Sequence, residues 1–390
     1  MDAKELPTHP SLDQYKKQAK DLLKSCKSGD AESIRRIERF KLKPEEISLA
    51  GAQFVIAREH AFESWPKFKK HIEAIVRQHS PVSNFEAAAD AVVAGDVATL
   101  TRLLREDPKL IRARSTRAHQ STLLHYVGAN GIEDFRQKTP RNAVEITKIL
   151  LNAGAEVDAD NGDYGGRGTA LGLVATSVHP ARMGVQIALL DTLLQAGASP
   201  DGLPGGWNPL IAALHNGRGH AAEFLADRGA RLDLEGAAGA GRLEVVKSFF
   251  DASGIVKPNA TRAQMEDGFL WACEYGHIGV VEFLLDKGLG VATKRGCTGL
   301  HWAAFNAHAD IVKLFLKRKA PLDVRDDNFD GTPLGWALYA WGDPPPEAER
   351  DRYQETVALL VAAGAHVEPV WLTHEKVRAD PSMAAALRGR

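Results

Sequence analysis

The sequence has few cysteines, and no pattern ties them together. Its 390 residues contain only Cys26, Cys273 and Cys297, which are widely separated and include no C-x-x-C pair. Few, scattered and odd-numbered cysteines are typical of reduced thiols in the cytoplasm and not of a disulfide framework or a zinc site. We therefore expect a cytoplasmic protein without a structural metal or a disulfide.

A long apolar run and an excess of either charge are also missing. No stretch of 18 apolar residues occurs, and the first residues lack the apolar segment of a signal peptide. The 49 Lys and Arg residues nearly balance the 50 Asp and Glu residues, and the formal net charge is −1. Since no overall field attracts nucleic acid or an anionic membrane, we expect neither as a partner.

The common motifs of catalytic and cofactor sites are absent or incomplete. There is no G-x-x-x-x-G-K-[ST] and no G-x-S-x-G. His374-Glu375 begins like a zinc-protease helix, but Arg378 stands where the second histidine is required. The acidic loop 158–168 has a misplaced glycine for a calcium loop, and Thr169 replaces the glutamate of its twelfth position. The sequence therefore predicts no cofactor.

What the sequence does contain is a repeated helical unit, which is clearest in the stretch 296–327. Thr298 can cap a first helix, where backbone N–H groups lack partners. The next helical turns place small apolar residues on one face, at i, i+3, i+4 and i+7; these are Leu300, Ala303, Ala304 and Ala307. A second helix carries too many apolar residues for a single exposed helix; these are Ile311, Val312, Leu314, Phe315 and Leu316. Such a unit needs copies of itself on either side.

The segment TGLHWAA followed by IVKLFLKRKAPLDVRD resembles an ankyrin repeat, with a period of about 33 residues. Similar units, about eight in all, cover roughly 83–370, and the first of them is degenerate. The resemblance implies an all-α dominated ankyrin-repeat solenoid, built of helix–turn–helix units joined by β-hairpins. It also implies that His125 and His301 form structural hydrogen bonds within their turns.

The N-terminal residues 1–80 have a different pattern, which predicts four helices. They resemble a helical segment that precedes ankyrin repeats in bacterial proteins, which implies a bacterial ankyrin repeat protein. We expect 1–80 to be a capping region that covers the apolar face of the first repeat. The repeats would then occupy 83–370, and residues 371–390 would form a C-terminal capping helix.

Three insertions separate an inner from an outer helix: Ile132–Asn142, His179–Gly184 and Asp343–Gln354. All three fall on the same edge of an ankyrin stack. Insertions gathered on one edge often mark the working side of a repeat protein.

Three tryptophans occupy the same slot of successive units, and polar or aromatic residues follow them on the same helical face. The tryptophans are Trp271, Trp302 and Trp336, followed by Glu274, Tyr275, Phe305, Asn306 and Tyr339. The resemblance implies that this face lines a concave groove. The aromatic side chains are either core residues or an exposed wall, and we favour the wall because a second face is available for stacking.

The strongest site prediction is a pocket at repeats four to seven. Gly236 and Gly239 leave the inner face of the fifth unit almost without side chains. Aromatic residues of the sixth and seventh units would border this dent on one side, and His215 and Asn216 on the other. Hairpin residues, including Trp207, would close it.

Three functions fit such a groove. The first, which we favour, is binding of a protein or peptide partner by a monomer, with the aromatic side chains as anchors. The second is a small-molecule or sugar site. The alternative from another class is an enzyme of hydrolase, lyase or cyclase type acting on a small organic or sugar-like substrate, with Glu274, His215 and Asp330 (or Asp327) as acid/base residues. The predicted ligand-binding residues are Trp271, Tyr275, Trp302, Phe305, Asn306, Trp336, Tyr339, Asn216 and Trp207.

Overall fold

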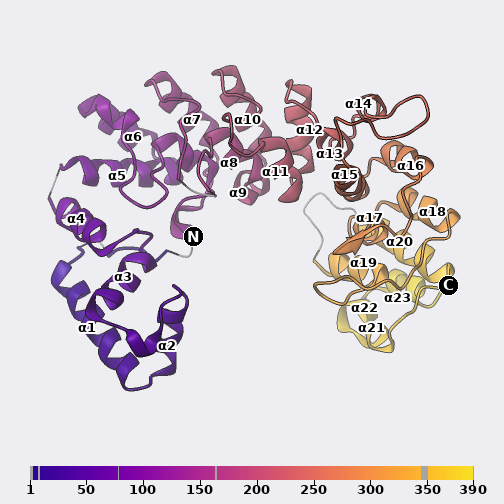
Figure 1. Cartoon of the computed structure of the whole chain (residues 1–390), viewed down its shortest axis with the longest axis horizontal. Helices are drawn as coiled ribbons and strands as arrows, with labels where there is room; N and C mark the ends of the chain where they lie inside the picture. Colours follow the sequence, from indigo (N-terminus) through magenta and orange to yellow (C-terminus); the bar gives the residue numbers. More distant parts are fainter. Residues whose placement is uncertain (1–2, 8, 78, 163–164, 344–349, 390) are drawn as a thin grey trace. The chain divides into compact units, whose positions relative to one another are not determined.

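The computed structural model describes residues 3–7, 9–77, 79–162, 165–343 and 350–389 (Figure 1). Part of the insertion Asp343–Gln354 and part of the acidic loop 158–168 lie outside the described residues. Helices dominate what is described, as the sequence predicts. The chain forms two compact units, 1–221 and 222–390.

The first unit begins with the four predicted helices around a core of their own. They are α1 (Leu12–Lys27), α2 (Ala31–Glu38), α3 (Leu49–Glu59) and α4 (Trp65–Ile75), with the short η1 (Pro44–Glu46) before α3. Each helix turns one apolar face inward, because its buried residues recur at helical spacing. The core residues include Tyr15, Leu22, Ile37, Val55, Phe62, Phe68 and Ile72.

Repeat-like helices complete the first unit. They are α5 (Pro81–Ala94), α6 (Val97–Glu106), η2 (Pro108–Arg112), η3 (Leu123–Gly128), η4 (Asp134–Arg136), α7 (Ala143–Asn152), α8 (Ala170–Thr176), α9 (Val178–Arg182), α10 (Gln186–Gln195) and α11 (Pro209–His215). The inner helix η3 is a 3-10 helix, and the chain leaves it at Ala129 with a φ of 46°. Helix α12 (Gly219–Asp227) contains the boundary between the two units.

The second unit is built of helix pairs. Its elements are α13 (Leu234–Gly239), α14 (Leu243–Ser248), α15 (Arg262–Glu274), α16 (Ile278–Asp286), β1 (Lys294–Arg295), β2 (Cys297–Thr298), α17 (Gly299–Phe305), α18 (Ala309–Lys317), α19 (Pro333–Gly342), α20 (Arg350–Ala362), α21 (Pro369–Thr373), α22 (Glu375–Ala379) and α23 (Pro381–Leu387). The inner helices α13, α15, α17 and α19 pack side by side in chain order (Figure 1).

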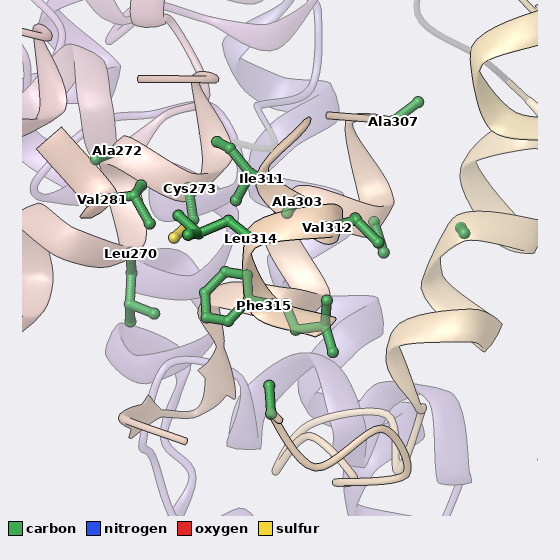
Figure 2. Close-up of a cluster of buried hydrophobic side chains, with 14 of the residues drawn as sticks. Leu270, Ala272, Cys273, Val281, Ala303, Ala307, Ile311, Val312, Leu314 and Phe315 are labelled. Carbon is green, nitrogen blue, oxygen red and sulfur yellow. The ribbon is translucent and has the colours of Figure 1, made fainter. Parts of the chain in front are cut away.

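One continuous apolar core runs through the second unit. The predicted face of α17 is buried, and Phe315 of α18 is fully enclosed among residues of α15 and α17 (Figure 2). The helices approach closely because Gly299 begins α17. A Cβ atom there would lie 2.7 Å from Cys273 Sγ and 2.8 Å from Phe315 Cζ.

The histidines of the turns make the structural hydrogen bonds that the resemblance implies. His301 Nδ1 accepts a hydrogen bond from the backbone N–H of Thr298, and its Nε2 lies 3.1 Å from the carbonyl oxygen of Gly331. His125 repeats this arrangement with Thr122 and with the carbonyl of Ala159. Each histidine thus ties the start of an inner helix to the next hairpin, and the prediction is confirmed.

We expect Gly299→Ala to destabilise the second unit by about 1–3 kcal/mol, since the added methyl group overpacks the core around Phe315. The matched control is Gly279→Ala in α16, where the new Cβ would lie 3.6 Å from Leu243 Cδ2, an ordinary contact. That control should be neutral or stabilising by up to about 1 kcal/mol. Thermal unfolding of both variants measures the difference. Equal effects of the two variants would contradict this packing.

A buried cluster of charged residues joins the N-terminal helices to the first repeats. Arg117 donates to the carbonyl oxygen of His60 at 3.1 Å and to Glu86 Oε2 at 3.0 Å. Arg136 also donates to Glu86 Oε2, at 2.8 Å, and to Glu133 Oε1, at 3.2 Å. Burial alone would raise the pKa of the Glu86 carboxyl, but the two arginines lower it to about 2. The four side chains are therefore charged at neutral pH and depend on one another.

We propose that residues 1–80 cap the repeats, because the loop around Arg117, which belongs to the repeat region, packs against His60 and Phe62 of the N-terminal segment. A fragment 81–390 loses the His60 carbonyl and the ring of Phe62, over which the Arg117 guanidinium lies at 5.2 Å. Removing one partner of a buried charge is strongly destabilising. We expect this fragment to aggregate or to unfold at a lower temperature, as measured by light scattering and circular dichroism. A soluble fragment with unchanged thermal stability would refute the capping role.

Candidate functional site

A pocket of about 480 Å³ opens in the second unit, between α17, α19 and the hairpin loop before α19. Among the described residues, its lining consists of aromatic side chains and glycines. They are Trp302, Phe305, Phe329, Gly331, Gly335, Trp336 and Tyr339. Four of the predicted ligand-binding residues therefore meet in one pocket. The tryptophan slot and the positions after it supply these side chains from neighbouring repeats.

Three rings form adjoining walls of this pocket. The centroids of Trp302 and Trp336 lie 5.1 Å apart, and their planes meet at 85°. Phe305 lies 6.0 Å from Trp302 at 86° and 5.7 Å from Trp336 at 73°. Edge-to-face pairs of this kind stabilise one another by about 0.5–1.5 kcal/mol beyond their buried area. These contacts between the rings therefore hold the walls of the pocket in place without a ligand.

The carboxylate of Asp326 organises the hairpin loop at the pocket. It accepts hydrogen bonds from the backbone N–H groups of Asn328, Phe329 and Gly331, each at 2.8 Å. It also accepts one from Trp336 Nε1 at 3.0 Å. One buried side chain thus fixes both the loop that carries Phe329 and the indole of the pocket wall.

The same hydrogen bonds keep Asp326 ionised. Burial, at 4% exposure, would raise the pKa of this carboxyl, but the N–H groups of Phe329 and Trp336 and the other donors lower it to about 2. The donors are neutral, so they do not cancel the charge. A negative charge therefore lies behind the pocket at neutral pH.

The aromatic side chains are neither fully core nor fully exposed. Trp302 and Phe305 are half-buried and pack against the core, whereas Phe329 and Tyr339 are 80% and 74% exposed. Two exposed aromatic rings at the mouth of one pocket form an apolar patch of the kind that marks an interaction site. The two interpretations left open by the sequence thus apply to different residues of the series.

The remaining predicted residues of the second unit lie outside the pocket lining. Trp271 is half-buried and donates from Nε1 to Glu235 Oε1 at 3.0 Å. Asn306 uses its amide to donate to the Trp302 carbonyl at 3.2 Å, and Tyr275 ends α15. Sequence reasoning missed Phe329 and Asp326. The signal for both was the stretch DDNFDG, which places an exposed aromatic residue among acids in a hairpin.

Glu274 occupies the position in α15 that Phe305 occupies in α17. Its side chain is buried, with 9% exposed, and its Oε2 atom has no hydrogen-bond partner among the described residues. Burial raises the pKa of the Glu274 carboxyl to about 8, against a smaller lowering by a hydrogen bond with Tyr275. Glu274 is therefore largely a neutral acid at pH 7.

Because the pKa of Glu274 is raised in the folded chain, we expect the stability to decrease as the pH rises. Between about pH 4.5 and 8 the folded chain keeps a proton that the unfolded chain releases, so the free energy of unfolding falls by about 1.4 kcal/mol per pH unit. The side chain of the Glu274→Gln variant does not ionise, so this dependence on pH is removed. As the pH rises through this window, the free energy of unfolding of the variant should increase by roughly 3–5 kcal/mol relative to that of the parent. Denaturant melts from pH 4.5 to 8.5 test this, with Glu282→Gln, an exposed carboxyl on α16, as control. A difference that does not change with pH would show that Glu274 is ionised.

Trp207 and Asn216 line a separate hollow of about 540 Å³ in the first unit. The indole of Trp207 lies against α8 because Gly172 has no side chain; a Cβ there would be 2.5 Å from the ring. The rest of the lining is mostly polar: Ala129, Asn130, Gln137, Thr176, Ser177, Val178, His179, Ala212 and Arg218. His215, beside Asn216, is exposed.

The predicted dent at Gly236 and Gly239 is not part of either pocket, and both glycines are buried. Helix α15 packs closely on α13, where a Cβ at Gly268 would lie 2.8 Å from Ala238 Cβ. The prediction of an open dent is wrong, because Gly236 and Gly239 are both buried.

The acid/base group proposed for an enzyme gains no support from the structure. His215 belongs to the first unit, whereas Glu274 and Asp330 belong to the second and neither lines the aromatic pocket. Asp330 pairs with Arg325, and Asp327 pairs with Lys294. Within the described residues, no three His, Cys, Asp or Glu side chains are grouped so as to hold a metal ion.

A family model for ankyrin repeats in three copies matches residues 234–328 and 269–370. The palmitoyltransferase Hip14 of Drosophila melanogaster is 35% identical over 96 residues, which are 24% of this chain and 13% of that protein. The E3 ubiquitin-protein ligase hecd-1 of Caenorhabditis elegans is 41% identical over 58 residues, 15% of this chain and 2% of that protein. The crystal structure of the human ASB11 ankyrin repeat domain is similar over 63% of this chain and 99% of that chain, at 20% sequence identity and a TM-score of 0.29.

Residues 234–370 are therefore ankyrin repeats, and the predicted fold class is confirmed. The chain spans only a small part of the length of the curated relatives named here, so their enzymatic activities are not transferred to it. These relatives are animal proteins, which gives no support to the bacterial origin implied by the N-terminal segment. None of the described helices is long and apolar enough to cross a membrane.

Proposed function

We propose that the chain is an ankyrin-repeat binding protein and that the aromatic pocket of the second unit holds a peptide segment of a protein partner. One observation carries the proposal: Phe329 and Tyr339 are exposed at the mouth of a pocket whose walls are aromatic. Rigid, exposed aromatic side chains are typical anchors of protein interfaces. Ankyrin repeats are also a scaffold that suits protein binding, because their stacked helices present one extended surface.

The chemistry of the lining favours a peptide over a small polar ligand. A small-molecule site usually combines an apolar body with a few convergent polar groups that fix orientation. Here the lining side chains are aromatic, and one of their few polar atoms, Trp336 Nε1, already donates to Asp326. A partner that inserts one side chain and covers the rest of the patch fits better. A cytoplasmic location and a monomeric state remain part of this proposal.

The exposed rings are the best positions for testing partner binding. Trp302 packs against the core, so its truncation also risks the fold, whereas Phe329 and Tyr339 can be shortened without opening the core. Burial of an exposed aromatic ring contributes about 1.5–3 kcal/mol, so we expect Phe329→Ala and Tyr339→Ala each to weaken peptide binding at least about tenfold. Peptides selected from a random displayed library on the whole protein, then measured by calorimetry, provide the readout.

Ile255→Ala is the matched control, because Ile255 is 65% exposed in the same unit and does not line the pocket. It should leave binding unchanged. Melting temperatures of all three variants must stay near that of the parent. Selected peptides that bind all variants equally well would place the binding surface elsewhere and refute the proposal.

A further inference from the structure

We propose that the aromatic pocket recognises an alkylated ammonium group, such as a quaternary ammonium, carried by the bound partner. This rests on the proposed function, and it names the chemistry of the group that enters the pocket. Two independent features support it: the arrangement of the rings and the charge behind them.

The rings are placed so that one ligand group can contact several of them. Trp302, Phe305 and Trp336 lie in nearly perpendicular planes with centroids 5.1–6.0 Å apart, and all three line the pocket. Ring faces attract a cation within about 6 Å of the centroid, and tryptophan does so best. Phe329 and Tyr339 add two exposed rings at the mouth. An alkylammonium group has an apolar surface for these rings and carries a charge that they attract.

The charge around the pocket is negative. Asp326 lies behind the wall, where it accepts the Trp336 Nε1 hydrogen bond, and its other donors are backbone N–H groups. The loop that holds Phe329 also carries Asp327 and Asp330. Both of these are paired, with Lys294 and Arg325 respectively, so the buried Asp326 is the main source of unbalanced charge. A negative charge without a cationic partner favours a cation in the adjacent pocket.

A purely apolar side chain is the competing occupant. It would gain the same ring contacts but nothing from Asp326, and it would not need the ring faces in particular. An unmodified lysine would gain the charge but has to lose a strongly hydrated ammonium shell. The alkylated ammonium group satisfies both features at once.

The test is a titration of the whole protein with choline and with 3,3-dimethylbutan-1-ol. The second compound has the same shape, with a neutral carbon in place of the nitrogen. Tryptophan fluorescence and NMR chemical shifts report binding at Trp302 and Trp336. We expect choline to bind about tenfold more tightly, which corresponds to about 1.4 kcal/mol. Phe329→Ala should weaken choline binding severalfold, and Ile255→Ala should not.

The role of the charge is tested by Asp326→Asn, which should reduce the preference for choline towards that for the neutral compound. If this variant does not fold, the two-compound comparison in the parent still decides the matter. Equal or weaker binding of choline, or no binding of either compound at 50 mM in the assay, overturns the inference. The peptide proposal fails separately, when no selected peptide depends on Phe329 or Tyr339.

Discussion

The structure depends on the fact that one helix pair cannot bury its own apolar surface. In the second unit this surface is buried by stacking through small residues. Ala303 and Ala304 of α17 are fully buried, and Gly299 allows α15 and α18 to pack closely against α17. Small residues on the stacking face bring the inner helices close together. The aromatic side chains at the tryptophan slot and three residues after it, in α17 and α19, lie outside this stacking face and line the pocket.

A single carboxylate connects this scaffold to the site. Asp326 belongs to the hairpin that His301 ties to α17 through the Gly331 carbonyl, and it holds both Phe329 and Trp336. The loop conformation, the wall of the pocket and the local charge therefore share one cause. Loss of this group would change all three, which is why the exposed rings and not Asp326 give the clearest measure of binding.

The sequence is sufficient to predict the helices, the repeats and the tryptophan slot, because these follow from helical periodicity and capping. It places Trp302, Phe305, Trp336 and Tyr339 on one surface, and the structure brings them together. It does not show how closely two helices approach. For this reason Gly236 and Gly239 suggested a gap, although both are buried in the folded unit.

The burial of Glu274 and the position of Phe329 were out of reach for a similar reason. Both depend on contacts between repeats or within a loop, and periodicity within one helix carries no information on either. The sequence predicts an acid/base role for this carboxyl in the groove, under the enzyme alternative. In the folded unit it is a buried neutral acid, with a pKa raised to about 8 by that burial.

The tryptophan slot is covered in one repeat of the first unit and partly open in the second unit, and an insertion accounts for the covered one. In the second repeat the slot holds Tyr126, which is fully buried. The insertion Ile132–Asn142 covers it: the Tyr126 hydroxyl donates to Glu133 Oε1 at 3.4 Å, and the guanidinium of Arg136 lies 5.8 Å from the ring centroid. This insertion therefore closes the slot in the first unit, and its Gln137 lines the hollow beside Trp207. Trp302 and Trp336 are left only half-buried, so in the second unit the slot still lines an open aromatic pocket.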